Sequence, residues 1–433
     1  MVQATGYAKG WTATVVGVVV LLGTTTLPAQ PSDDAVEATF VEGMDALENE
    51  RYKSAIRAFS NILDREPQLH RARLELALAY YRTLRYEDAT RLAQEVLDDP
   101  TTPAEVRVTV LAFLAQVEKD KEQFSRKSSF SSFIGAGIMH DSNVNVGPTN
   151  AGIRVGDVDL TLAPGSTGQS DNAYVVNAGV DHLFQTGKRV DFGERTGTLL
   201  WQSGGGIYWR RYHEQNDYDL LVASLNTGPA LLMLRNWRAS LQLKSDYLTI
   251  GGEALGWFNG VSPAITWQVP NGEVTWDFEY TRRFYHRDVD DGREGDYLDT
   301  GVTLGRYLKN RSISATAGLR AIKFFADDDQ YGYWGGQLDL GYSAETWENG
   351  TFYIRGRGGA YAYDGDEPLY GKERNDLELR TTAGITHAYK QDDDLLKNWL
   401  VNLFWERTYN NSNIGDLYTY KRYQMMLMLS RNF

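Results

Sequence analysis

The chain ends in Tyr423-Gln424-Met425-Met426-Leu427-Met428-Leu429-Ser430-Arg431-Asn432-Phe433. Side chains alternate between the two faces of a strand, so a strand here would place Tyr423, Met425, Leu427, Leu429 and Phe433 on one face. A closing strand with an apolar outer face and a terminal aromatic residue is typical of an outer-membrane β-barrel. The alternative is the last strand of a soluble sheet.

The same alternation recurs throughout residues 127–433, where the hydrophobic period changes to two. Between Val274 and Thr281, for example, Val, Trp, Phe and Tyr alternate with Thr, Asp and Glu. Segments of this kind are long enough for tilted strands that cross a bilayer. The pattern predicts fourteen strands, at residues 130–141, 172–186, 198–212, 217–232, 237–249, 256–268, 273–285, 297–308, 312–325, 333–346, 351–363, 375–389, 398–410 and 419–433.

The connections between these segments also alternate in length. Residues 142–171, 286–296 and 364–374 are long and polar, whereas Pro270-Asn271-Gly272 and Glu348-Asn349-Gly350 are hairpin signals. Outer-membrane barrels pair short periplasmic turns with longer external loops, so we expect an antiparallel transmembrane barrel. Because fourteen is even, the barrel would begin and end on the same side, which is the periplasmic side if the helical domain precedes the first strand. Residues 187–197 and 390–397 are expected as longer periplasmic connections. A soluble β-sandwich is the structural alternative, but it explains the 26 Tyr and 11 Trp less readily.

The first 29 residues indicate an export signal. Lys9 precedes an apolar stretch from Trp11 to Gly23, which is short for a membrane span. Cleavage is expected near Ala29, although Leu27 departs from the small-x-small pattern. An uncleaved inner-membrane anchor is the alternative.

Residues 30–126 predict a short helical domain built from repeats. Identical or similar residues recur 34 positions apart, as in Gly43 and Ala77, Tyr52 and Tyr86, Ala55 and Ala89, and Leu63 and Leu97. This period resembles the tetratricopeptide repeat. A third apolar-periodic helix, residues 104–124, would cap the stack. The predicted fold is therefore a short α-helical repeat domain in the periplasm, followed by a 14-stranded antiparallel barrel at 127–433.

The repeat resemblance implies a binding groove lined by the first helix of each repeat. The matching positions are Phe40, Met44 and Leu47 in the first repeat, and Leu74, Leu78, Tyr81 and Arg82 in the second. Packing of helix on helix is the alternative for each residue, because an apolar helix stripe is usually core. Tyr81 and Arg82 are the stronger candidates, since they offer an amphipathic ring and a charge.

Composition and motifs exclude several classes of function. The chain has no Cys, so disulfides, thiolate metal sites, a Cys nucleophile and lipid attachment through an N-terminal Cys are excluded. A net charge of -13 argues against nucleic-acid binding. The segment His140-Asp141-Ser142-Asn143 has part of the spacing of a calcium loop, but the Gly and distal Glu of that motif are not in place. We predict no catalytic residue, metal or cofactor, and read the acidic loops as solvated surface.

The run from Phe133 to Asn145, which includes Gly135, Gly137 and the His140–Asn143 segment, resembles the barrel opening of the surface lipoprotein assembly modulator (Slam) family. Asn411-Ser412-Asn413-Ile414, Tyr418, Tyr420, Arg422 and the last strand are also similar, as is the order of the two domains. The resemblance implies that the helical repeats receive a lipoprotein or secreted protein client and that the barrel helps to move it to the cell surface. About two repeats is fewer than the family usually has, which implies a different or smaller client.

We therefore predict a non-enzymatic outer-membrane translocation factor, with outer-membrane lipids, lipopolysaccharide and the barrel assembly machinery as further partners. The barrel would open at the seam between its first and last strands. The seam residues are Phe133, Gly135 and Gly137 on the first strand and Met425, Leu427, Leu429 and Phe433 on the last. A channel for a polysaccharide or small solute is the second hypothesis, and a structural interaction protein is the third.

Overall fold

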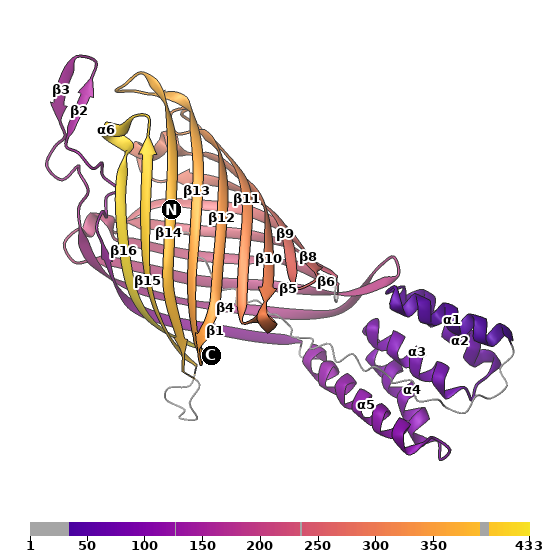
Figure 1. Cartoon of the computed structure of the whole chain (residues 1–433). Helices are drawn as coiled ribbons and strands as arrows, with labels where there is room; N and C mark the ends of the chain where they lie inside the picture. Colours follow the sequence, from indigo (N-terminus) through magenta and orange to yellow (C-terminus); the bar gives the residue numbers. More distant parts are fainter. Residues whose placement is uncertain (1–33, 126, 234–235, 390–397) are drawn as a thin grey trace. The chain divides into compact units, whose positions relative to one another are not determined.

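The computed structural model describes residues 34–125, 127–233, 236–389 and 398–433 (Figure 1). The predicted export signal at 1–29 and the connection at 390–397 lie outside these residues. The chain forms two compact units. Of the described residues, the first unit holds those of 34–128, 184–200 and 231–233, and the second holds those of 129–183, 201–230 and 236–433.

The helices of the first unit follow the predicted repeat. They are α1 (Asp34–Glu48), α2 (Tyr52–Arg65), α3 (His70–Arg82), α4 (Tyr86–Asp98) and α5 (Ala104–Ser125). Ala55, Ala77 and Ala89 are fully buried, so the small residues of the 34-residue period allow neighbouring helices to approach closely. None of the helices in the described residues combines the length and apolar character that a bilayer crossing requires.

The strands form a closed antiparallel barrel of fourteen, as predicted (Figure 1). Neighbouring strands follow the sequence order, and β1 pairs with β16 to close the barrel. The barrel strands are β1 (Ser128–Asp141), β4 (Asp171–Phe192), β5 (Arg195–Tyr212), β6 (Leu220–Met233), β7 (Trp237–Ile250), β8 (Glu253–Val269), β9 (Gly272–Tyr285), β10 (Gly295–Leu308), β11 (Ile313–Ala326), β12 (Tyr333–Trp347), β13 (Gly350–Glu367), β14 (Lys372–Ala388), β15 (Trp399–Ser412) and β16 (Tyr420–Asn432).

The two faces of the barrel wall differ in chemistry. Large apolar side chains are exposed on the outside, for example Leu225 and Leu319, each 67% exposed. Charged side chains of alternate residues, such as Asp277 and Arg320, bond to one another across the inner face. Period-two alternation produces this division because successive side chains of a strand point to opposite faces. We call the end where β1 begins and β16 ends the terminal end, and the opposite end the loop end.

One expectation about the connections is wrong, and another is incomplete. Residues 187–197 do not form a long connection, because β4 and β5 continue through them and meet at Gly193-Glu194, where Gly193 has φ +59°. The apolar alternation stops near residue 186, but backbone pairing continues beyond it, since ladder hydrogen bonds do not depend on apolar side chains. Residues 142–171 are not simply a polar loop: β2 (Gly152–Val155) and β3 (Val158–Thr161) form a separate two-stranded sheet within them.

The remaining short elements of the described residues lie in connections. A four-residue helix, α6 (Gly415–Tyr418), joins β15 to β16 at the loop end. The 3-10 helices are η1 (Asn216–Tyr218), η2 (Asp288–Arg293) and η3 (Lys309–Arg311). The backbone amide of Arg154 in β2 donates to the Asp416 carboxylate of α6 at 3.0 Å, so the small sheet is attached to the β15–β16 connection.

Candidate functional site

The seam between β1 and β16 is a continuous antiparallel ladder. It runs from the pair Phe133 and Asn432 to the pair Asp141 and Gln424. Beyond it, the Ser132 amide donates to the Phe433 carbonyl at 3.2 Å, and the Phe433 amide donates to the Ser132 carbonyl at 2.8 Å. The seam is therefore closed by backbone hydrogen bonds along its length.

The predicted seam residues lie on both faces of this ladder. Gly135 pairs with Ser430 and Gly137 pairs with Met428, and these positions share the inward parity of Phe133. Met425, Leu427, Leu429 and Phe433 are exposed on the outer face. A Cβ atom added to Gly137 would lie 2.4 Å from the Leu427 carbonyl oxygen, so the close approach of β16 requires Gly there. Whether these residues open the seam stays a prediction.

A buried ionic cluster fastens the seam at the loop end. The Asp141 carboxylate is 0% exposed, and the Arg422 Nε donates to its two oxygens at 2.9 and 3.1 Å. The Tyr212 hydroxyl donates to Asp141 at 2.8 Å, and the Gln424 amide donates at 2.9 Å. We call Asp141, Tyr212, Arg422 and Gln424 the latch. A charge-assisted, multiply bonded pair of this kind is strong because each remaining lone pair is satisfied.

The residues after Asp141 extend this fastening. The Asn143 side-chain amide donates to the carbonyls of Gly147 and Lys421 at 2.9 and 3.1 Å, while its oxygen accepts from the Gly147 amide at 2.9 Å. The Ser142 amide donates to the Tyr423 carbonyl at 2.9 Å, and the Tyr423 amide donates to the Ser142 hydroxyl at 2.7 Å. The His140–Asn143 segment thus ties the first loop to β16, and the described residues hold no group of three acidic or His side chains placed for a metal.

An apolar cluster backs the latch on the inner face. Met139 and Met428 pack with Ala173, Val175 and Tyr212, all less than a tenth exposed. Val144 of the first loop joins the same cluster. Because the Asp141 carboxylate is fully buried, its ion pair with Arg422 is screened less than an exposed pair would be. Separation of β1 from β16 here would expose this charge and apolar surface together.

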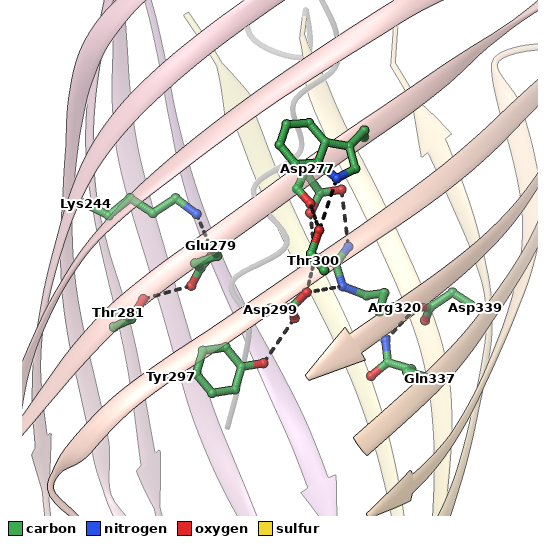
Figure 2. A network of polar contacts seen from close by, with 11 residues as sticks. Lys244, Asp277, Glu279, Thr281, Tyr297, Asp299, Thr300, Arg320, Gln337 and Asp339 are labelled. Carbon is green, nitrogen blue, oxygen red and sulfur yellow. Dashed lines mark hydrogen bonds and ion pairs between the residues drawn. The ribbon is translucent and has the colours of Figure 1, made fainter. Parts of the chain in front are cut away.

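The inner wall carries a second polar network, which Figure 2 shows from Lys244 of β7 to Asp339 of β12. Arg320 lies between Asp277 and Asp299, with its Nε 2.8 Å from the Asp299 carboxylate. Lys244 donates to Glu279 at 2.7 Å, and Arg357 donates to Asp339 at 2.7 Å. These fixed charges of both signs make the inner wall of the barrel polar.

The residues predicted for the helical groove are divided between core and half-buried positions. Phe40 is 4% exposed and its ring packs 5.5 Å from that of Phe59, so it contributes to the core of the first unit. Met44 and Leu47 pack at the edge of the same core, and Leu74 packs on a second apolar cluster. Leu78 is half-buried.

Tyr81 and Arg82, the stronger candidates, lie at the end of α3. The Tyr81 hydroxyl donates to Asp120 of α5 at 2.5 Å, and its ring packs 5.7 Å from Phe113. The Arg82 guanidinium lies 5.8 Å from the Tyr81 ring centre. Tyr81 therefore helps to join α3 to α5, and client binding by all seven groove residues stays a prediction.

Within the first unit, the end of the β4–β5 hairpin contacts α2. Helix α2 has no side-chain cap of its own, and the Glu194 carboxylate accepts from the Ser54 amide at 2.8 Å. Lys53 lies 3.1 Å from Asp191, and Arg195 donates to Glu50 at 2.8 Å. A carboxylate at a helix N-terminus accepts hydrogen bonds from free amides and interacts favourably with the positive end of the helix dipole. We call these contacts the hairpin contact.

We predict that Glu194→Gln weakens α2 and the hairpin contact. Burial alone would raise the pKa of the Glu194 carboxyl, but hydrogen bonds from Ser54 and the charge of Arg57 outweigh burial and lower this pKa. A lowered pKa means that the stabilisation is present above the ordinary pKa of Glu and is lost as pH falls through the lowered value. The expected loss at neutral pH is about 0.5–1 kcal/mol in the free energy of helical unfolding, the low end for a helix cap because the carboxylate is partly exposed.

The measurement is urea unfolding of the full chain in detergent, followed by ellipticity at a wavelength that reports helix. Glu118→Gln, on the exposed surface of α5 with Lys121 4.0 Å away, is the matched control. Equal effects of the two substitutions would show that the hairpin contact adds nothing to the stability of the helices.

The sequence interpretation missed the latch. The sequence motifs contain Asp141 and Arg422 but give no reason to pair them, and Tyr212 and Gln424 fall within predicted strands without a distinguishing signal. One signal could have found them: Asp141 and Arg422 are charged residues at inward positions near the loop ends of the first and last strands, which pair in a closed barrel.

Comparison with known proteins identifies the helical repeat and finds solved structures similar to the barrel. A tetratricopeptide repeat model matches residues 46–112. The barrel is similar to the outer membrane channel DcaP of Acinetobacter baumannii, with 9% identity, 71% of this chain and 97% of that chain covered, and a TM-score of 0.38. It is also similar to an anion-selective porin from Comamonas acidovorans, with 10% identity, coverage of 71% and 99%, and a TM-score of 0.35. A bacterial polysaccharide outer membrane secretin gives 9% identity, coverage of 69% and 98%, and a TM-score of 0.36. No curated protein matches the chain.

Proposed function

We propose that this protein is a non-enzymatic translocation factor of the outer membrane, which delivers a lipoprotein or secreted protein client to the cell surface. The observation that carries the proposal is the direct succession of a helical repeat domain and a closed barrel: α5 ends at Ser125 and β1 begins at Ser128. Helical repeats present extended surfaces suited to binding another chain, and a barrel is the form in which strands cross an outer membrane. The resemblance of Phe133–Asn145 to the Slam family supports the same function.

The barrel surface supports a membrane position. Trp257, Trp267, Trp276 and Trp405 are exposed on its outer face together with many Leu side chains. Aromatic side chains at the two interfaces and aliphatic side chains between them are the pattern of a lipid-facing barrel. In this proposal the terminal end, which the helical domain precedes, is periplasmic, and the loop end faces the exterior.

The test is deletion of the gene, followed by protease treatment of intact cells and mass spectrometry of the surface proteins. We expect loss of one or a few proteins from the surface and their return with the wild-type gene. Complementation with Leu78→Asp, in the predicted groove, is expected to fail, whereas Val41→Asp, 59% exposed on α1, is the matched control. An unchanged surface proteome would contradict client delivery.

A channel for a polysaccharide or small solute is the second candidate, favoured by the charged inner wall around Arg320. Conductance across a planar bilayer distinguishes the two. A channel predicts steady conductance that changes in ion selectivity with Arg320→Gln, whereas client delivery predicts surface-protein loss without a requirement for steady conductance.

A further inference from the structure

The two halves of the β1–β16 seam are held by different forces. Residues Phe133–Ile138 of β1 are Phe, Ile, Gly, Ala, Gly and Ile, and none of these side chains has a hydrogen-bonding atom. Over these six residues, β1 can hold β16 only through the backbone ladder and apolar contact. This half of the seam lies toward the terminal end.

The other half carries the latch and the bonds of the first loop. Asp141, Ser142 and Asn143 all bond to residues between Lys421 and Gln424. The Asp141–Arg422 pair is largely buried, so its separation would leave an unpaired charge in a low-dielectric site. The two ends of one ladder therefore differ strongly in their resistance to separation.

The opposite edge of β1 is anchored independently. β1 is bonded to β4 on that side, and the Gln185 amide of β4 donates to the Lys127 carbonyl at 2.8 Å. If β16 separates at the terminal end, β1 keeps this partner and presents one unpaired edge. In a bilayer the free amides and carbonyls of that edge have no water to bond, so only another extended backbone satisfies them.

We propose that the seam opens from the terminal end with the latch as its hinge, and that the freed edge at Phe133–Ile138 pairs with an extended segment of the client. The proposal rests on the proposed function for its client. The recognised chemistry is that of a β-strand added to a sheet edge: main-chain hydrogen bonds supply the affinity. The outer face of β1 carries Ile134, Ala136 and Ile138, so apolar residues at alternate positions of the client strand would continue the lipid-facing surface.

Hydrogen exchange of the full chain in lipid nanodiscs tests, without a client, whether the seam opens from the terminal end. Ser132 and Phe433 each donate a backbone hydrogen bond to the other. Because antiparallel pairs alternate, the amides of even-numbered β1 residues point to β16 and those of odd-numbered residues point to β4. We expect the Ile134 and Ala136 amides to exchange at least about tenfold faster than those of His140 and Ser142. The Gly135 and Gly137 amides are internal controls that stay protected. Equal exchange along the even-numbered positions would overturn the proposal.

Disulfide crosslinks test the route. The chain has no Cys, and Ile134 with Arg431 and His140 with Met425 are outward-facing pairs of the same ladder type. We expect the oxidised Ile134→Cys/Arg431→Cys variant to lose client export by at least about tenfold and to regain it on reduction, because the terminal half can no longer open. His140→Cys/Met425→Cys is expected to leave export within about twofold, because the hinge stays closed in any case.

The outcomes separate the two proposals. Export blocked equally by both crosslinks, or by neither, would overturn opening from the terminal end. An unchanged surface proteome after gene deletion would contradict the client function. Faster amide exchange at the terminal end of β1 in the same protein would still support opening of the seam from that end.

Discussion

Asp141→Ala is expected to lower the free energy of unfolding of the barrel by about 3–5 kcal/mol, the usual effect of removing one partner of a buried ion pair. The substitution leaves the Arg422 guanidinium, whose side chain is 18% exposed, without its carboxylate. It also removes the acceptor of the Tyr212 and Gln424 hydrogen bonds. The buried charge and the two lost acceptor contacts act in the same direction.

The measurement is reversible urea unfolding of the barrel in lipid vesicles, followed by Trp fluorescence. Asp159→Ala is the matched control, because Asp159 also binds an Arg through two bonds, of 2.6 and 2.9 Å to Arg154, but on an exposed surface. We expect the control to leave stability within experimental error, since exposed pairs contribute little. A similar small effect of both substitutions would show that the latch does not stabilise the seam.

The double variant Asp141→Leu/Arg422→Met gives a second check on the same cause. Replacement of both charges by apolar residues of similar size removes the stranded charge, and such replacements are often neutral or stabilising. We expect it to recover most of the stability lost in Asp141→Ala. Failure to recover would assign the loss to packing rather than to the unpaired charge.

Phe59→Ala is expected to unfold most of the helical repeat domain while the barrel stays folded. Phe59 is fully buried, and Phe40 packs against it. Truncation of a buried Phe typically destabilises by about 3–5 kcal/mol, which is comparable to the total stability of a small domain. The expected result is loss of the helical ellipticity at ambient temperature, with the barrel still migrating as a folded species on an unheated gel.

Val41→Ala on α1 is the control, because Val41 is 59% exposed and its truncation leaves no internal cavity. If the helical domain receives the client, Phe59→Ala reduces surface delivery as far as gene deletion does. Normal delivery by a chain with an unfolded helical domain would contradict a role for the repeats.

Most of the fold was predictable because it depends on periodicity. All fourteen strands of the barrel were expected from period-two alternation, and the repeated helices from identities 34 residues apart. The error at 187–197 has a physical cause: the β4–β5 ladder extends beyond the apolar surface, so Arg189 and Asp191 of the ladder and Glu194 of its turn carry no apolar alternation. The β2–β3 sheet was missed because four-residue strands are too short to show a period.

The candidate site was less predictable. The order of strands predicts Phe133, Gly135 and Gly137 at the seam, and the structure pairs them with β16. The spacing of the groove residues does not distinguish core positions from binding positions. An apolar stripe has the same spacing whether it packs on another helix or binds a partner. Phe40 is core, and Tyr81 bonds Asp120, a residue 39 positions away.

The sequence by itself determined the architecture: a helical repeat domain, a closed barrel, and a last strand whose odd-numbered residues face outward. These properties follow from the local alternation of apolar and polar side chains, which depends only on residues close together in the sequence. The tertiary structure alone decided the latch, because Asp141 and Arg422 are 281 residues apart and meet only when the barrel closes. Tyr212 reaches the same carboxylate from a third strand and packs with Met139 and Met428, so only the closed barrel buries this ion pair.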